Sequence, residues 1–412
     1  MKNKKKKKVK TKELAYNDFN LKGIIDINEG RVVSAINNYN KALTTLKASS
    51  VGIYSNLGAA LAQLNYFDEA FPLFEEALKI SHKIPEVFWN YSLSLLKAEE
   101  FKKGWRHYQV RWKVEKFPSV KRNFTHKKYE GYKNLTGKKL FIASEQGVGD
   151  EIMFLSILNN VLTQWTTNVV VDIDKRLLPI FNRSFPTVQF IEKTLVPTKD
   201  TSIDYYINMG DLPYHFRNSP DDFLPYPSKP YLKADPDKVK HFKEKYEKLF
   251  KGKTLVGLAW FSVKLKNKNI RLDQLKEVFE VAKEKNIQFI NLQYDATKTG
   301  DDVDRQLKLA KSQFGVDIYN DDEVNPVKEF EDTAAQLMAL DLVLSTSNTA
   351  VHLAGALGVE TWVMLPINYD MRWGKPDRDK ALWYPTVKLL KSDKPENWQP
   401  TLDKVIEGLK GL

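Results

Sequence analysis

Two loops of the sequence place glycine residues, or hydroxyl and carboxylate side chains, at the start of an expected helix. The first, "SEQGVGDEI" (residues 144–152), follows the apolar run "KKLFIA", and the second, "LSTSNTAVHLAGALG" (residues 344–358), begins where a β-branched run ends. A loop that leads from a parallel strand into a helix lies at the carboxyl edge of the sheet, where the first N–H groups of the helix can bind an anion. Both loops are therefore candidate parts of a ligand site.

The first loop combines two glycines with a carboxylate. Gly147 and Gly149 allow a tight turn without Cβ clashes, and Asp150 stands where the helix macrodipole stabilises a negative charge. An acidic residue at this place is often only a helix cap, and spacing alone favours that simpler interpretation. The loop lacks the G-x-G-x-x-G pattern of dinucleotide binders, and a carboxylate would repel a phosphate. If the loop is functional, Asp150 accepts a proton and Gln146, Gly147 and Gly149 bind substrate.

The second loop gathers hydroxyl, amide and helix N–H groups in six consecutive residues, a set that suits a diphosphate or a ribose. Its members are Ser347, Asn348, Thr349, Ala350, Val351 and His352. Helix capping by Ser347 or Asn348 is the alternative, and His352 is either a phosphate donor or a buried core histidine.

Basic and aromatic residues elsewhere in the second half add further candidates. The cations that follow the strand-like run "TLVGLAW" are Lys264, Lys266, Lys268 and Arg271. They form either a solvated loop or part of an anion site. Trp373, Trp383 and Tyr384 either stack on a base or sugar or pack the C-terminal segment. No H-E-x-x-H, C-x-x-C, G-x-S-x-G or G-x-x-x-x-G-K-[ST] motif occurs, which leaves zinc hydrolase, serine hydrolase and P-loop functions without support.

The elements that must position these residues alternate between strand-like and helical patterns after residue 121. Short apolar runs such as "KKLFIA", "TNVVVDI" and "IDYYINM" are separated by helical runs, and a proline-rich passage precedes a second series that begins near "TLVGLAW". Such alternation favours parallel α/β sheets. We predict one Rossmann-like domain over residues 121–235 and a second over residues 236–412.

Residues 13–120 carry an internal repeat with a period of 34 to 35 residues. Asn56 aligns with Asn90 and Phe67 with Phe101, and small residues recur at Gly58 and Ala70. This pattern resembles the tetratricopeptide repeat (TPR), a helix–turn–helix unit, and predicts an all-α solenoid. Its concave face either binds a peptide or braces the next domain.

Composition limits the remaining classes of function. The formal net charge is +12, but eight of the lysines lie in residues 1–12, so this segment is expected to be a disordered basic tail. The tail has no interleaved aromatic residue, so nucleic acid is not an expected partner. We expect no signal peptide and no transmembrane segment, and the sequence contains no cysteine, which fits a cytoplasmic protein.

Several fragments, in order along the chain, carry a resemblance to a known family. They are "GWRHYQVRW", "SEQGVGDEIMF", "VGLAW", "FINLQYD", "FEDTAAQLMALDLVLSTSNTAVHLAGALGVETWVMLP" and "RWG". The chain resembles bacterial TPR glycosyltransferases, whose catalytic half is similar to lipopolysaccharide heptosyltransferases (glycosyltransferase family 9) and, more distantly, to O-linked N-acetylglucosamine transferases. The resemblance implies a GT-B fold of two Rossmann-like domains and metal-independent transfer of a hexosyl or heptosyl group with inversion.

The resemblance also implies roles for particular residues. Asp150 matches the general base, the segment 347–352 matches the donor diphosphate loop, and Lys264, Lys266 or Arg271 would neutralise the leaving group. Many relatives have an aspartate where Ser347 stands, so a contact made through that carboxylate is in doubt. The expected partners are a nucleotide-sugar, which is a substrate and not a cofactor, and an acceptor protein or glycan precursor met by the repeats. The main alternative is a non-catalytic TPR scaffold; a sugar-nucleotide epimerase ranks last.

Overall fold

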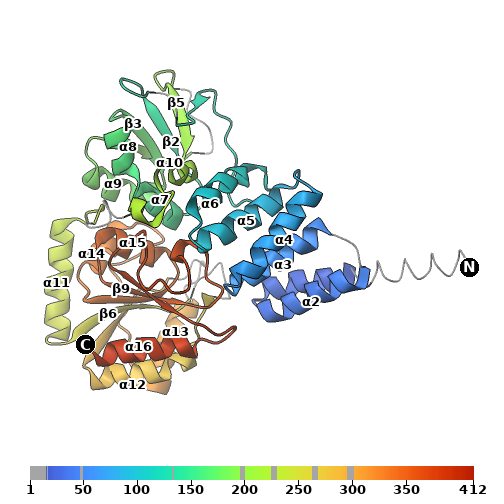
Figure 1. Cartoon of the computed structure of the whole chain (residues 1–412). Helices are drawn as coiled ribbons and strands as arrows, with labels where there is room; N and C mark the ends of the chain where they lie inside the picture. Colours follow the sequence, from blue (N-terminus) through green and yellow to red (C-terminus); the bar gives the residue numbers. More distant parts are fainter. Residues whose placement is uncertain are drawn as a thin grey trace, which may run out of the picture. The chain divides into compact units, whose positions relative to one another are not determined.

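The computed structural model describes residues 15, 17–46, 50–131, 134–194, 200–223, 230–261, 268–294 and 301–412. The chain divides into two compact units, whose elements are labelled in Figure 1. Unit 1 consists of Met1–Phe117, Leu365–Arg378 and Lys391–Pro400, and unit 2 of Pro118–Met364, Asp379–Leu390 and Thr401–Leu412. Within the described ranges, no helix has both the length and the apolar character needed to cross a membrane.

Unit 1 is helical, as the sequence predicts for this region. Residues 17–28 are helical, and the elements that follow are α2 (Val32–Leu46), α3 (Val51–Gln63), α4 (Phe67–Ile80), α5 (Pro85–Lys97), α6 (Phe101–Tyr108) and the 3₁₀ helix η1 (Gln109–Lys113). Helices α3 and α4 pack closely because Gly58 has no side chain. A Cβ there would lie 3.1 Å from the Ala70 carbonyl and 3.1 Å from the Phe74 ring.

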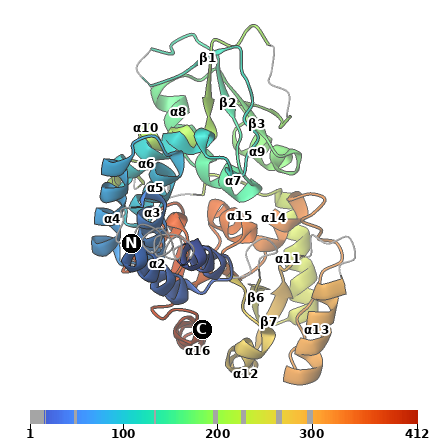
Figure 2. The same ribbon diagram turned by 90° about the vertical axis from the view of Figure 1, so that its right-hand side faces the viewer.

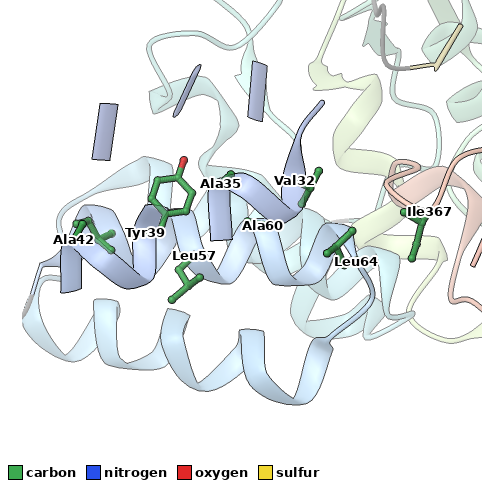
Figure 3. Packing of buried hydrophobic residues seen from close by; sticks show 9 residues of the cluster. Val32, Ala35, Tyr39, Ala42, Leu57, Ala60, Leu64 and Ile367 are labelled. Atoms are coloured by element: carbon green, nitrogen blue, oxygen red, sulfur yellow. The ribbon is translucent and has the colours of Figure 1, made fainter. Parts of the chain in front are cut away.

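The core of unit 1 includes a residue from far along the chain. Figure 3 shows Val32 and Tyr39 of α2, together with Leu57 of α3 and Leu64 directly after α3, in one buried cluster with Ile367. The 3₁₀ helix η7 (Met371–Trp373) packs against α5. The segments 365–378 and 391–400 therefore complete the helical unit, a grouping that local sequence patterns do not indicate.

The first sheet of unit 2 is parallel and has the order β1-β5-β2-β3-β4. Its strands are β1 (Lys127–Lys128), β2 (Leu140–Ala143), β3 (Val169–Ile173), β4 (Gln189–Glu192) and β5 (Tyr205–Asn208). The helices among these strands are α7 (Val148–Leu155), α8 (Leu158–Gln164), η2 (Lys175–Leu177), α9 (Leu178–Ser184), η3 (Met209–Asp211), α10 (Leu212–Phe216) and η4 (Pro220–Phe223). The strand order reverses between β2 and β5.

The second sheet has the order β10-β9-β8-β6-β7, with parallel pairing of β6 to β7, β6 to β8 and β8 to β9. Its strands are β6 (Thr254–Ala259), β7 (Ile287–Asn291), β8 (Leu342–Thr346), β9 (Thr361–Leu365) and β10 (Val387–Lys391). The helices of this part are α11 (Pro236–Phe250), η6 (Leu272–Leu275), α12 (Lys276–Glu284), α13 (Asp301–Phe314), α14 (Glu331–Leu337), α15 (Thr349–Leu357) and α16 (Gln399–Lys410). The order reverses between β6 and β8, and ligands of open α/β sheets bind outside the carboxyl ends of strands at such a point.

The architecture agrees with the expected helical N-terminal region followed by two parallel α/β sheets. The boundaries proposed from sequence at residues 120 and 235 remain predictions.

Candidate active site

The glycine loop lies at the carboxyl end of β2 and leads into α7. Gln146 adopts a left-handed backbone with φ of 60°, and Gly147 is the extended residue that precedes the helix. The Gln146 N–H donates to Ser119 Oγ at 2.6 Å, while the Gln146 carbonyl accepts a bond from Lys193 Nζ at 3.4 Å. The N–H and the carbonyl of Gln146 are therefore both fixed by neighbouring side chains.

Asp150 caps its own helix. Its Oδ2 atom accepts a hydrogen bond from the Gly147 N–H at 3.2 Å, and the Asp150 N–H donates to the Gly147 carbonyl at 3.0 Å. The capping interpretation of this residue is thus realised in the structure. A carboxylate can accept several hydrogen bonds, so the cap is compatible with a second role as proton acceptor.

The neighbouring acidic residue, Glu151, lies under the loop and is 1% exposed. Burial raises the pKa of Glu151 to about 7, although Lys193 Nζ lies 3.1 Å from Oε1 and the Asp174 N–H donates to Oε2 at 2.8 Å. Burial disfavours the ionised carboxylate by more than these two contacts stabilise it. The sequence alone gives no reason to distinguish Glu151 from other acidic residues in a first helical turn.

The second predicted loop leads from β8 into α15. Asn348 caps the helix by accepting a bond from the Ala350 N–H at 3.0 Å, and Gly358 ends it with φ of 78°. Ser347 Oγ accepts a bond from Lys268 Nζ at 3.5 Å, and Lys268 is only 7% exposed. A buried cation therefore lies beside the residue that immediately precedes the helix cap.

The structure brings the two loops together. Helices α7 and α15 are in contact and lie side by side in Figures 1 and 2. A Cβ on Gly149 would lie 2.8 Å from His352 Cδ2, so only glycine allows this approach. His352 is 5% exposed, and its Nδ1 atom hydrogen bonds with the Tyr384 hydroxyl at 2.9 Å.

A cavity of about 460 Å³ adjoins the first turn of α15. That volume is in the range of small-molecule sites. The lining residues are Asn291, Leu292, Gln293, Tyr294, Val303, Asp304, Asn320, Asp321, Val324, Asn325, Pro326, Val327, Phe330, Thr333, Gln336, Thr349, Ala350 and Leu353. The Thr333 hydroxyl is buried and has no hydrogen-bond partner among the described residues. Such an atom is satisfied when a polar ligand or water fills the space.

The other predicted site residues lie elsewhere. Arg271 is exposed and forms an ion pair with Asp273 at 2.8 Å.

Trp373 is 0% exposed in unit 1 and offers no ring face to a ligand, while Trp383 packs against Phe223 with ring centroids 4.9 Å apart. Lys264 and Lys266 lie outside the described residues. Val351 is 0% exposed and belongs to the interior face of α15.

The sequence does not single out three residues of this region. Lys268 belongs to the predicted run of cations, but nothing in that run marks it as the buried one. Gln293 Oε1 accepts the Trp260 and Phe261 N–H groups at 3.2 and 3.0 Å. Gln293 and Thr333 lie in the fragments "FINLQYD" and "FEDTAAQL", but nothing in those fragments marks either residue as part of a site. In the described ranges, no group of three or more His, Cys, Asp or Glu side chains is arranged to hold a metal ion.

Comparisons with known proteins give distant similarities. No family model matches the chain. Protein FlbA of Caulobacter vibrioides is 28% identical over 323 residues, which cover 74% of this chain and 52% of FlbA, so the chain spans about half the length of that relative.

Among solved structures, Escherichia coli ADP-heptose lipopolysaccharide heptosyltransferase II is 12% identical with a TM-score of 0.45, over 66% of this chain and 98% of that one. The glycosyltransferase family 9 protein of Veillonella parvula is 11% identical with a TM-score of 0.42, over 66% and 93%. An O-GlcNAc transferase of Thermobaculum terrenum is 12% identical with a TM-score of 0.34, over 96% and 83%. At these values, the function has to be argued from the site.

Proposed function

We propose that this chain is a glycosyltransferase that moves a sugar from a nucleotide-sugar to an acceptor hydroxyl. The observation that supports this proposal is the cavity that adjoins the first turn of α15, at the carboxyl side of a sheet whose strand order reverses between β6 and β8. Nucleotides bind at such a position in open α/β sheets. The cavity can hold a nucleoside, with the Thr333 hydroxyl as one polar contact.

The diphosphate of the donor would lie at the N-terminus of α15. The positive end of the α15 macrodipole and the buried ammonium of Lys268, 3.5 Å from Ser347 Oγ, supply positive charge there. These groups would neutralise the departing diphosphate, which is the role that we propose in place of a metal ion.

The reaction would proceed by direct displacement. The acceptor oxygen attacks the anomeric carbon, and its proton passes to the Asp150 carboxylate. The bond from that carbon to the diphosphate oxygen breaks, and the electron pair leaves with the diphosphate. The close approach of Gly149 to His352 supports this assignment because it brings the first turn of α7, which carries Asp150, beside α15. A single displacement of this kind inverts the anomeric configuration.

The helices of unit 1 would be TPR repeats that recruit the acceptor, a protein or a glycan precursor. Their support is the repeat of 34 to 35 residues and the close packing at Gly58. We further propose a cytoplasmic location, which the absence of cysteine favours.

Thermal unfolding with UDP, ADP, GDP, CMP and their common sugar derivatives tests the donor site, because a ligand of the folded state raises apparent stability. We expect one nucleoside diphosphate to raise the melting temperature and Lys268→Met to abolish that rise. Arg271→Met is the matched control, since its side chain is exposed and paired with Asp273. A well-folded protein that responds to none of these nucleotides contradicts the proposal.

A non-catalytic scaffold is the second candidate, and the capping bond from the Gly147 N–H to Asp150 is the observation in its favour. The variant Asp150→Asn separates the two candidates. If the protein is an enzyme, the wild type transfers sugar, and Asp150→Asn loses that transfer but keeps nucleotide binding. If the protein is a scaffold, the wild type binds nucleotide but transfers no sugar to any acceptor in an extract of its host.

A further inference from the structure

Arg176 connects the part of unit 2 that is built on the first sheet (β1 to β5) to the wall of the cavity. The residue lies in η2, just after β3, and its Nη1 atom donates to the carbonyls of Pro326 at 3.3 Å and Val327 at 3.5 Å. Its guanidinium lies 4.9 Å from the centre of the Phe330 ring. Pro326, Val327 and Phe330 all line the cavity.

The guanidinium is held in this position by Asp174. Arg176 Nε donates to Asp174 Oδ1 at 2.8 Å and Nη2 donates to Oδ2 at 2.9 Å. This two-point pairing fixes the plane of the guanidinium as well as its place. The remaining nitrogen, Nη1, is the one directed to the cavity wall.

Asp174 is in turn connected to the glycine loop. Its N–H donates to Glu151 Oε2 at 2.8 Å, and Glu151 follows directly after Asp150. Glu151 Oε1 lies 3.1 Å from Lys193 Nζ, and the same Nζ atom donates to the Gln146 carbonyl at 3.4 Å. A continuous series of contacts therefore runs from the cavity wall to both ends of the turn that carries Asp150.

We infer that Arg176 is a positioning residue that couples occupancy of the cavity to the position of the first turn of α7. The inference rests on the proposed function, because it assumes that a nucleotide fills the cavity. A ligand in contact with residues 326–330 fixes the two carbonyls that Arg176 binds. Arg176 and Asp174 then hold Glu151, and with it the turn that presents Asp150 to the acceptor.

Hydrogen exchange of the full chain tests this coupling. In the wild type, the nucleoside diphosphate that raises the melting temperature should slow amide exchange both in the cavity wall, residues 325–331, and in the loop, residues 144–153. In Arg176→Ala, we expect the wall to stay protected by the ligand and the ligand-dependent protection of the loop to be lost. Arg176→Lys should not restore the ligand-dependent protection of the loop. An ammonium lacks the separate N–H donors by which the planar guanidinium binds Asp174 and the cavity wall at the same time.

Arg183→Ala is the matched control. Arg183, in the part of unit 2 built on the first sheet, donates to Glu331 Oε1 in the second part at 3.0 Å. Its hydrogen-bond partners among the described residues are Lys233, Asp235 and Glu331, and none of these lines the cavity. Its removal should leave ligand protection in both segments. Coupling energies between sites typically change affinities about fivefold or more, so the dissociation constant of the nucleotide should rise by a similar factor in Arg176→Ala.

The outcomes separate the two proposals. If the wild type binds a nucleotide and Arg176→Ala retains ligand protection in the loop, the coupling is refuted while the donor site stands. If Arg183→Ala loses the loop protection as well, the effect is a general loosening of the fold and the specific role of Arg176 is refuted. If no nucleotide binds the wild type, the proposed function and this inference both fail.

Discussion

At the scale of single residues, the buried carboxyl of Glu151 is the most consequential group near the proposed base. Burial raises its pKa to about 7 from an ordinary value of 4.5, while Lys193 and the Asp174 N–H act in the opposite direction. The folded state therefore binds a proton at this site more tightly than the unfolded chain does. The resulting contribution to stability is fully present below a pH of about 4.5 and is lost as the pH rises toward and through about 7.

Replacement of Glu151 by glutamine should remove this pH dependence. Between pH 5 and pH 8, the free energy of unfolding of the wild type should fall relative to that of Glu151→Gln, by no more than roughly 3 kcal/mol. Urea unfolding of both proteins across this range measures the difference. His107 and His215, whose pKa values are lowered first of all by burial, affect both proteins equally and cancel. Parallel pH profiles would show that Glu151 does not titrate in this range.

Single residues also mark the limit of sequence-based prediction of the site. Asp150 and Asn348 are indicated by their place at the start of a helix, because capping is a local property of the chain. Glu151, Lys268 and Thr333 acquire their character from burial by distant segments, which local spacing does not reveal. The exposure of Arg271 and the burial of Trp373 likewise depend on tertiary packing.

At the scale of elements, the contact of α7 with α15 is the feature that unites the two loops. It depends on a glycine in the first turn of α7, because a Cβ on Gly149 would lie 2.8 Å from His352. Moving the imidazole to make room would strain its 2.9 Å hydrogen bond with Tyr384. The packing of these helices is therefore sensitive to one methyl group.

The variant Gly149→Ala should lower the free energy of unfolding by about 1 to 2 kcal/mol, because overpacking outweighs the gain in helix propensity. Gly147→Ala is the control, since its Cβ would meet nothing closer than Asp150 Oδ2 at 3.7 Å. Thermal and urea unfolding provide the measurement. Equal stability of the two variants would mean that α7 and α15 are not packed in the manner described.

Most strands of unit 2 could be predicted from sequence, since they are short apolar runs bounded by turns. The runs "KKLFIA" and "TNVVVDI" contain β2 and β3, and "TLVGLAW" contains β6. The strands β1 and β10 were not predicted. β1 has only two residues, both exposed, and β10 follows a segment whose aromatic residues, Trp383 and Tyr384, are candidate stacking groups on sequence grounds.

At the scale of the whole molecule, the chain leaves unit 2 twice to complete unit 1. The returning segments are tied to the helices by polar contacts. Lys97 Nζ donates to the carbonyls of Gln63 at 2.8 Å and Ile367 at 3.2 Å, and it lies 4.2 Å from the centre of the Tyr369 ring. Burial lowers the pKa of Lys97 well below its ordinary value. Repeat periodicity predicts the helices of this unit but not the segments that cover them, since those lie some 270 residues away in sequence.

Glu99 is the second attachment point, and its ion pair with Arg378 offers the sharpest test of this organisation. The side chain of Glu99 is 4% exposed, it pairs with Arg378 Nε, accepts a bond from Nη2 at 2.6 Å, and also accepts the Lys375 N–H at 3.2 Å. The variant Glu99→Gln keeps the shape but weakens these charge-assisted bonds, and we expect it to lose about 1 to 3 kcal/mol of stability.

Limited proteolysis should show where that loss occurs. In Glu99→Gln, cleavage within residues 365–378 should become faster than in the wild type, because the segment detaches from the helices more often. Glu75→Gln is the matched control: its pair with Lys103 at 3.3 Å is exposed, and exposed pairs contribute about 1 kcal/mol or less. Cleavage that accelerates equally in both variants, or in neither, would mean that residues 365–378 are not held to unit 1 through Glu99.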